Sequence, residues 1–566
     1  MTSPARWSPA ARCLAAGALS GLLMAVALPA IDVPMVAWIA LVPWLWELAK
    51  GPTVRQGFLS GFSYGLFLHL FSCAFLWTVL TRHAGMGPAL ASASFVVAAL
   101  AGLPFQVLIG AFGAWSCRRH GAVGLLGLAV LLPASDAIRA RMTTGFPWAF
   151  PGMSQADHPA VLAVAELGGV HAVSLVIFLV NACWVACLRA HRVTEGRTVS
   201  LRVGMAAAAI TLVLLTFGVV VSRDHSQAEV VAWRIGTESD PLAEPREGRA
   251  AWSSPPDSRR DERLRAALVQ AALPGEVSLG PSRGSSLSLQ LDLSRRALGA
   301  GAELLVWSES AYPGTIGSNP RPLRILRKLL ADSPAGAEAV IGALVEVDGS
   351  GRRLHNSVLL LDRTGMLGRH DKDYLVPFGE YLPAPWLFFW VEQRITGAVG
   401  TRMVRGGPPG TMQGARVRLG ATVCYEAVVP QMTASLARQG AQLLINVSND
   451  GWYHGSTAAE QHLRFSRVRA VETQRFVLRS AHSGITAVID PRGRILGRLE
   501  EGERGVLLVD MPTEVRDTLY SRVGDLPLAL LSLASVLMLT WWRRSSVETP
   551  SATEGEPGEP VSDGLA

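Results

Sequence analysis

The sequence predicts a protein of two parts: about eight membrane-spanning helices, and an α/β domain between the seventh and the eighth. Three observations predict this. Hydrophobic residues make up 49% of the 566 residues and charged residues only 17%, which is more apolar than ordinary soluble enzymes. The apolar residues are concentrated in long runs before residue 222 and after residue 525. Between 263 and 524, short apolar runs alternate with helical patterns, as they do in α/β domains.

The long apolar runs predict the spans, because a transmembrane helix needs about 20 apolar residues. The runs are 11–30, 33–49, 57–80, 89–116, 122–138, 161–188, 203–222 and 526–542. A buried core helix is the alternative for any single short run. We interpret the first run as a membrane helix rather than a signal peptide, because six more runs follow it and no small-residue cleavage site stands out.

Basic residues in the short loops predict the orientation, because cytoplasmic loops carry an excess of Lys and Arg. The basic residues of alternate loops are Arg6, Arg12, Lys50, Arg55, Arg118, Arg119, Arg189, Arg192, Arg197, Arg202, Arg543 and Arg544. The opposite loops hold fewer, mainly Arg82, Arg139 and Arg141. Both termini are therefore expected in the cytoplasm and the α/β domain outside it. These loops account for most of the net charge of +7, which is not a sign of nucleic-acid binding.

Composition divides the chain further. The predicted segments are a membrane domain of seven helices (1–222), a linker (223–262), the α/β domain (263–524), a last membrane helix (525–544) and a disordered tail (545–566). Strands are expected at 266–270, 303–307, 339–347, 357–361, 417–423, 442–447, 476–480, 485–489 and 505–510. Helices are expected near 285–299, 320–332, 427–439 and 457–474, and hairpin turns at 361–365 and 489–493. This order predicts a layered sandwich.

One cysteine stands apart from the other five. Cys13, Cys73, Cys117, Cys183 and Cys187 lie in or beside the apolar runs, so the α/β domain holds only Cys424 and has no disulfide of its own. Cys424 ends an apolar strand and precedes a helical pattern, where a helix N-terminus would favour the thiolate. The alternative is a small buried core residue.

A cysteine nucleophile needs a base and a group that stabilises an oxyanion. No histidine of the α/β domain falls in a cysteine-protease signature. Glu309 ends an apolar run, and Lys372 precedes the segment 375–383; each alone is more simply a solvated surface charge. The sequence has no metal-ligand cluster and no phosphate-cradling glycine loop with lysine, so we expect neither a metal nor a cofactor.

Taken together, these residues match a known pattern. Glu309, Lys372 and Cys424 form the Glu–Lys–Cys arrangement of the nitrilase superfamily. Over about 12–542 the sequence resembles the apolipoprotein N-acyltransferase family, the membrane-embedded branch of that superfamily. The supporting motifs are Gly145-Phe146-Pro147-Trp148, Ser154-Gln155, Glu166-Leu167-Gly168-Gly169-Val170, 375–383, Cys424-Tyr425-Glu426, Ser448-Asn449-Asp450-Gly451-Trp452 and 483–488. The sequence departs from the family pattern at Met153, Ala271, Ala272, Ser308 and Tyr374.

The resemblance implies a nitrilase-like α-β-β-α sandwich on the periplasmic side of a bacterial inner membrane. It implies acyl transfer from a membrane phospholipid, through a Cys424 thioester, to the amino group of S-diacylglyceryl-cysteine in an apolipoprotein. Glu309 would be the general base and Lys372 the oxyanion donor, with Glu380 orienting Lys372. Tyr425 and Glu426 would shape the site. The expected partners are the bilayer, the phospholipid and the diacylated apolipoprotein, with no nucleic acid, and we expect a monomer.

Two other functions fit parts of the sequence. A membrane-anchored nitrilase-type amidohydrolase would share the triad, but one anchor helix would suffice for it. A transporter with a soluble sensor would place charged or broken-helix sites at mid-membrane, whereas the candidate residues lie outside the spans. Within the α/β domain, the aromatic segment containing Trp386, Phe388, Phe389 and Trp390 is predicted to form a substrate-access arm at the lipid surface. The alternative for this segment is a buried helix.

Overall fold

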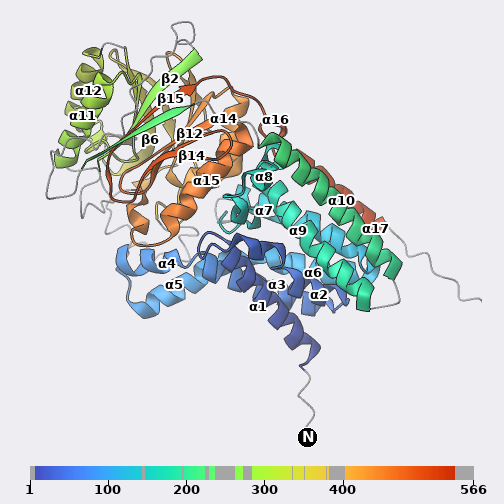
Figure 1. Cartoon of the computed structure of the whole chain (residues 1–566). Helices are drawn as coiled ribbons and strands as arrows, with labels where there is room; N and C mark the ends of the chain where they lie inside the picture. The colour runs from blue at the N-terminus through green and yellow to red at the C-terminus, as the bar shows by residue number, and fades with distance from the viewer. Residues whose placement is uncertain are drawn as a thin grey trace, which may run out of the picture.

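The computed structural model describes residues 7–83, 85–142, 147–192, 197–222, 228–235, 262–271, 284–333, 336–349, 351–377, 379–381 and 402–541. Figure 1 shows a helical region beside an α/β domain, with helix α15 of the α/β domain facing the helices. The helices of the helical region are α1 (Pro9–Ala27), η1 (Pro34–Trp38), α2 (Val42–Ala49), α3 (Val54–Ser72), α4 (Phe75–Thr78), η2 (Val79–His83), α5 (Pro88–Ala101), α6 (Leu103–His120), α7 (Val123–Arg141), η3 (Pro151–Gln155), α8 (Pro159–Leu162), α9 (Ala165–Arg192), α10 (Arg197–Val221) and α17 (Leu526–Trp541).

Each predicted apolar run coincides with one of these helices or with a pair of them, but the predicted number of spans is not confirmed. Among the described residues, α1, α7, α9 and α10 are long and apolar enough to cross a membrane. Two bent pairs raise the number to six: α3 with α4, bent by 55°, and α5 with α6, bent by 47°. The run at Pro34–Ala49 and helix α17 are shorter apolar helices. Each bent pair coincides with a single predicted run, so the difference from eight comes from these two shorter helices.

The α/β domain is a four-layer sandwich. One sheet has the strand order β1-β15-β2-β3-β5-β6-β7, with β4 beside β5 and β8 beside β6, and the other has the order β14-β13-β12-β11-β10-β9. The strands are β1 (Glu229–Ile235), β2 (Arg263–Gln270), β3 (Leu304–Trp307), β4 (Thr315–Ile316), β5 (Glu338–Glu346), β6 (Arg353–Leu361), β7 (Met366–Asp371), β8 (Arg402–Met403), β9 (Thr411–Gln413), β10 (Arg418–Val423), β11 (Leu443–Ser448), β12 (Phe476–Ala481), β13 (Thr486–Ile489), β14 (Ile495–Leu499) and β15 (Arg504–Pro512).

Buried apolar side chains from both sheets pack face to face and form the centre of the sandwich. Helices α11 (Gly284–Gly299) and α12 (Arg321–Ala331) cover the outer face of the first sheet. Helices α14 (Pro430–Arg438) and α15 (Ala458–Thr473) cover the second. The layers therefore run α-β-β-α, and every strand and helix predicted in this domain is present within about five residues of its predicted bounds.

The linker prediction is wrong at one place. Residues Glu229–Ile235 form β1, which pairs antiparallel with β15 from Glu229↔Asp510 to Ile235↔Arg504. This segment, Glu-Val-Val-Ala-Trp-Arg-Ile, is rich in β-forming side chains. Its signal was lost in the charged and proline-rich composition of the forty residues around it. Residues 236–261 of the predicted linker, the predicted tail 545–566 and the access segment 386–391 lie outside the described residues.

A kink in α9 joins the two parts of the molecule. Gly169 has φ +66°, and a Cβ there would lie 2.8 Å from the ring of Tyr520, so glycine is required for both reasons. The kink leaves the backbone N–H of Val170 without a helical acceptor, and this group donates to Glu472 Oε1 of α15 at 2.7 Å. The Glu-Leu-Gly-Gly-Val motif is therefore a structural joint that fixes α15 against the helices.

Ion pairs hold the same joint. Glu166, at the start of α9, accepts from Arg492 at 2.7 Å and from Arg516 at 2.5 Å. Arg464 of α15 makes a bidentate pair with Asp32, both contacts at 2.7 Å. Bidentate Arg–carboxylate pairs fix orientation as well as distance. The joint thus sets the position of α15, which lies behind the candidate site.

Candidate active site

Glu309 follows strand β3 by two residues and is 6% exposed. Its carboxylate accepts from Asn356 Nδ2 at 2.6 Å and from the backbone N–H of Asn449 at 2.7 Å, so both oxygens are held. Strand β5 passes very close, because a Cβ on Gly342 would lie 2.6 Å from Glu309 Cα. Only glycine at position 342 lets the carboxylate occupy this position.

Lys372 follows strand β7 directly and is 1% exposed. Its Nζ donates to Glu380 Oε1 at 2.8 Å and lies 4.0 Å from Glu309 Oε1. Glu380 is itself fixed, since its second oxygen accepts from the backbone N–H of Val376 at 2.8 Å. Glu380 therefore orients the ammonium group between two carboxylates.

Cys424 follows strand β10 directly, is 5% exposed and has φ +50°, an uncommon conformation for a side chain other than glycine. His462 is hydrogen-bonded through Nε2 to the carbonyl oxygen of Cys424 at 3.0 Å, so its contact is to the backbone and not to the thiol. The helix that begins at Cys424 is the short 3-10 helix η5 (Cys424–Val428), and the α-helix α14 begins only at Pro430.

The charges of the three groups depend on burial and on one another. Burial raises the pKa of the Cys424 thiol, and Glu309 adds to the rise while Lys372 opposes it. Burial also raises the pKa of Glu309, against the effect of Lys372 and of hydrogen bonds from Asn356 and the thiol. Burial alone would lower the pKa of Lys372, but Glu380 and Glu309 outweigh it and raise that pKa. Burial thus opposes the thiolate form that a helix N-terminus would favour, and the Glu309 carboxylate lies in hydrogen-bond contact with the thiol.

Glu426 connects Cys424 to the loop that carries Lys372. Its Oε1 accepts from the backbone N–H of Asp373 at 2.7 Å, and its Oε2 accepts from that of Val423 at 2.8 Å. His370 Nε2 lies 2.9 Å from Oε2. Burial would raise the pKa of Glu426, but His370 and the backbone donors lower it overall. Glu426 is thus an ionised brace that fixes Lys372 relative to Cys424.

A buried polar network behind Cys424 has no counterpart in the sequence predictions. Arg479 donates to Asp450 Oδ2 and to Asn446 Oδ1, both at 2.6 Å. His462 Nδ1 lies 3.1 Å from Asp450 Oδ1, and Asn446 donates to the Cys424 carbonyl at 3.3 Å. Through the hydrogen bonds to its carbonyl oxygen, this network stabilises the uncommon backbone conformation of Cys424. Asp450 lay in a quoted motif without a role, and no local signal marked Arg479.

Tyr425 points away from this network, toward the helical region. Its side chain belongs to a single apolar core that contains residues of both parts, and its hydroxyl is buried without a hydrogen-bond partner among the described residues. Phe75 packs against Trp148 with ring centroids 5.0 Å apart and against Tyr453 at 5.7 Å. Trp148 packs against Phe465 of α15 at 5.1 Å. We call these five residues, Tyr425, Phe75, Trp148, Tyr453 and Phe465, the aromatic wall. It lies beside Cys424 on the side of the helices.

The structure thus brings together Glu309, Lys372, Glu380 and Cys424, with Glu426 as their brace and Tyr425 on the side of the helical region. Trp386, Phe388, Phe389 and Trp390 lie outside the described residues, so the access arm stays a prediction. Asn356 and Asn449, which hold Glu309, were not predicted. Among the described residues, no three His, Cys, Asp or Glu side chains are grouped so that they could hold a metal ion.

Comparison with known proteins places this site in a family. The Carbon-nitrogen hydrolase family matches residues 265–520, and the Apolipoprotein N-acyltransferase N-terminal domain matches residues 20–183. Apolipoprotein N-acyltransferases from Rhodopseudomonas palustris and Geobacter metallireducens are similar along nearly the whole chain. The first is 30% identical, covering 95% of this chain and 96% of the relative, and the second is 28% identical, covering 94% and 95%.

Among solved structures, an amidase from Nesterenkonia sp. is 23% identical with a TM-score of 0.35, covering 48% of this chain and 97% of the amidase. The whole-length similarity is to the acyltransferases, and it includes the helical region as well as the α/β domain. The chain belongs to the apolipoprotein N-acyltransferase family.

Proposed function

We propose that this protein transfers an acyl chain from a membrane phospholipid to Cys424, and then from the thioester to the N-terminal amino group of S-diacylglyceryl-cysteine in an apolipoprotein. The observation that carries the proposal is the burial of a thiol, a carboxylate and an ammonium group together, next to the aromatic wall. Relatives across the whole chain bear the name of this activity.

In the first half-reaction, Glu309 accepts the thiol proton while Sγ attacks an ester carbonyl of the phospholipid. The ammonium of Lys372 donates to the oxyanion of the tetrahedral intermediate. The intermediate collapses to the thioester, and the leaving lysophospholipid oxygen takes the proton from Glu309. In the second half-reaction, the acceptor amine attacks the thioester, Glu309 takes the amine proton, and the leaving thiolate recovers it. Covalent catalysis of this kind divides one difficult transfer into two easier ones.

The alternative, an amidohydrolase, would use the same three groups but let water attack the thioester. The surroundings favour the acyltransferase. Tyr425 and Trp148 share one apolar core with the helices, so the nucleophile borders the part of the molecule that meets lipid. A soluble amide substrate needs no such contact.

The test uses the full-length protein in mixed micelles with an isotope-labelled phospholipid and a diacylglyceryl-cysteine peptide. We expect the peptide to gain the mass of one acyl chain, with an equal amount of lysophospholipid formed. Release of free fatty acid without acylation of the peptide would contradict the proposal and favour the amidohydrolase.

The location is also part of the proposal: a multi-pass protein of the bacterial inner membrane, with the catalytic domain on the periplasmic side. The basic loops and the apolar helices support it. A reporter that is active only outside the cytoplasm should be active when fused near residue 240 and silent when fused near residue 550. The reverse pattern would overturn this orientation.

A further inference from the structure

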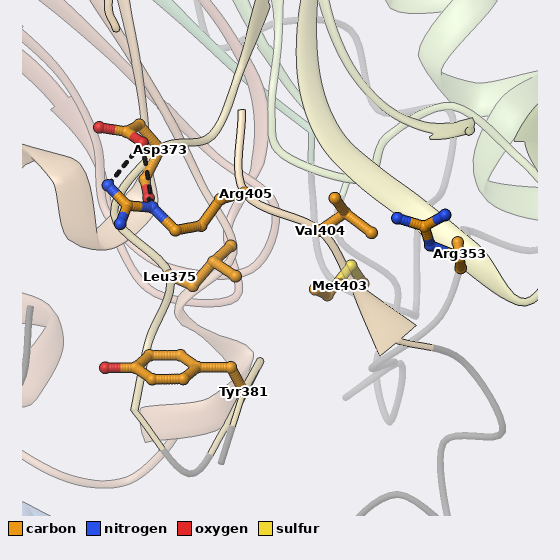
Figure 2. Close-up of a pocket in the computed structure, with 7 residues that line it drawn as sticks. All are labelled: Arg353, Asp373, Leu375, Tyr381, Met403, Val404 and Arg405. Carbon is orange, nitrogen blue, oxygen red and sulfur yellow. Dashed lines mark hydrogen bonds and ion pairs between the residues drawn. The ribbon is translucent and has the colours of Figure 1, made fainter. Parts of the chain in front are cut away.

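A pocket of about 390 Å³ lies beside the catalytic loop and outside the triad. Asp373 and Leu375, which follow Lys372, line it, and so does Tyr381, next to Glu380. Figure 2 shows Arg405 with Asp373 on one side of the pocket and Arg353 on the other, with Val404 and Met403 between them. The pocket is therefore one residue along the chain from the oxyanion donor.

The two arginines leave donors available to a ligand. Arg405 uses Nε and Nη2 to bind Asp373, with Nη2 at 2.8 Å from Oδ1, while no described contact engages its Nη1. The only ion pair of Arg353 among the described residues is with Asp348 at 3.8 Å, too long for a hydrogen bond. Both side chains are 53% exposed, so a ligand can reach them.

The surface between the arginines is apolar. Leu375 is buried, and Met403 and Val404 are half-buried. Two guanidinium groups across an apolar surface match an amphiphile with an anionic group more closely than a small soluble anion. Guanidinium groups bind phosphate oxygens through charge-assisted hydrogen bonds.

We propose that this pocket binds the phosphodiester head group of the donor phospholipid, with Arg353 and Arg405 as its ligands. The proposal rests on the acyl-transfer function above. In a phospholipid only the glycerol carbons separate the ester carbonyl from the phosphate, so a head group held here presents the ester to Cys424 beside Lys372. The acceptor amine carries no phosphate, so it lacks the group that the two arginines would bind.

The test compares two donors with the same acyl chains: phosphatidylglycerol, and diacylglycerol, which lacks the phosphate. Thioester formation on Cys424 is followed by mass spectrometry in the full-length protein while the mole fraction of donor in micelles is varied. The Arg353→Gln/Arg405→Gln variant should need about ten times more phosphatidylglycerol for half-saturation. Any disturbance of the loop that carries Lys372 by loss of the Arg405–Asp373 contact should affect both donors equally, so the additional loss with phosphatidylglycerol reports the head group. Added salt should weaken wild-type binding of phosphatidylglycerol, because the arginines are exposed.

Three controls make the result specific. Arg324→Gln/Arg363→Gln removes two exposed arginines outside the pocket and should leave both donors unaffected. Arg353→Gln alone does not disturb the lysine loop and should still raise the requirement for phosphatidylglycerol about threefold. Inorganic phosphate at constant ionic strength should not compete.

An unchanged requirement for phosphatidylglycerol, or an equal loss with both donors in the Arg353→Gln variant, would overturn the assignment. Competition by inorganic phosphate against wild type alone would assign the pocket to free phosphate instead. If the wild type formed no thioester with either donor, the acyl-transfer mechanism itself would be contradicted. A variant that behaves like an active wild type would contradict only the head-group assignment.

Discussion

The Cys424→Ala protein is expected to fold and insert normally but to lose acyl transfer by more than about 10⁴-fold, because no other group can form the thioester. The substitution removes one sulfur atom from a buried turn and leaves the hydrogen bonds to the Cys424 carbonyl in place. Thermal unfolding in detergent should therefore shift little. Mass spectrometry after exposure to phospholipid should find an acyl adduct in wild type and none in the variant.

The matched control is Cys187→Ala, which removes an exposed cysteine of the helical region. It should transfer at the wild-type rate and keep the adduct on Cys424. An adduct at the same yield in the Cys424→Ala protein would place the nucleophile elsewhere. Lost transfer together with lost thermal stability would mean that the cysteine has a structural role.

The sandwich could be predicted from the sequence because most of its longer strands, such as β5, β11 and β15, are nearly fully buried apolar runs separated by turn residues. The exposed strand β7 was not predicted. Glu309 and Cys424 lie at the ends of predicted strands, but no strand was predicted before Lys372, which follows β7. The three residues were therefore recognised only in combination, through their resemblance to the family motifs. Strand ends at one edge of a sandwich lie near one another in space, so charge at a strand end carries a signal that surface charge in general does not.

The groups that hold the triad had no such signal. Asn356 lies within β6 between His355 and Ser357, and a polar stretch at the start of a strand does not single out one residue as a partner of the site. The effect of Glu426 depends on four partners brought together by folding, of which His370 is 56 residues away. Burial has the largest effect on the pKa of Cys424, and burial is a property of the fold that the residues around Cys424 do not reveal.

Glu309→Gln and Lys372→Met are expected to have the next largest effects. The amide has the same shape as the carboxylate but cannot take the thiol proton, so thioester formation should fall about 10²–10⁴-fold. Lys372→Met removes the oxyanion donor, a loss of about 10²–10³-fold, and leaves Glu309 and Glu380 facing each other without a cation. Thioester formation in the double variant should be only slightly slower than in the slower of the two single variants, because both groups act in the same step.

The pH profile separates a base from a merely structural carboxylate. Glu309 accepts a proton only when it is ionised, and burial raises its pKa above the ordinary value. Wild-type thioester formation should therefore be full above that raised pKa and should fall as the pH is lowered through it. The residual rate of Glu309→Gln should lack this acid limb, while Glu346→Gln, a carboxylate at the end of β5 that binds Thr315, should keep both rate and profile. If the acid limb persisted in Glu309→Gln, another group would be the base, and Glu309 would serve only to position Asn356 and Lys372.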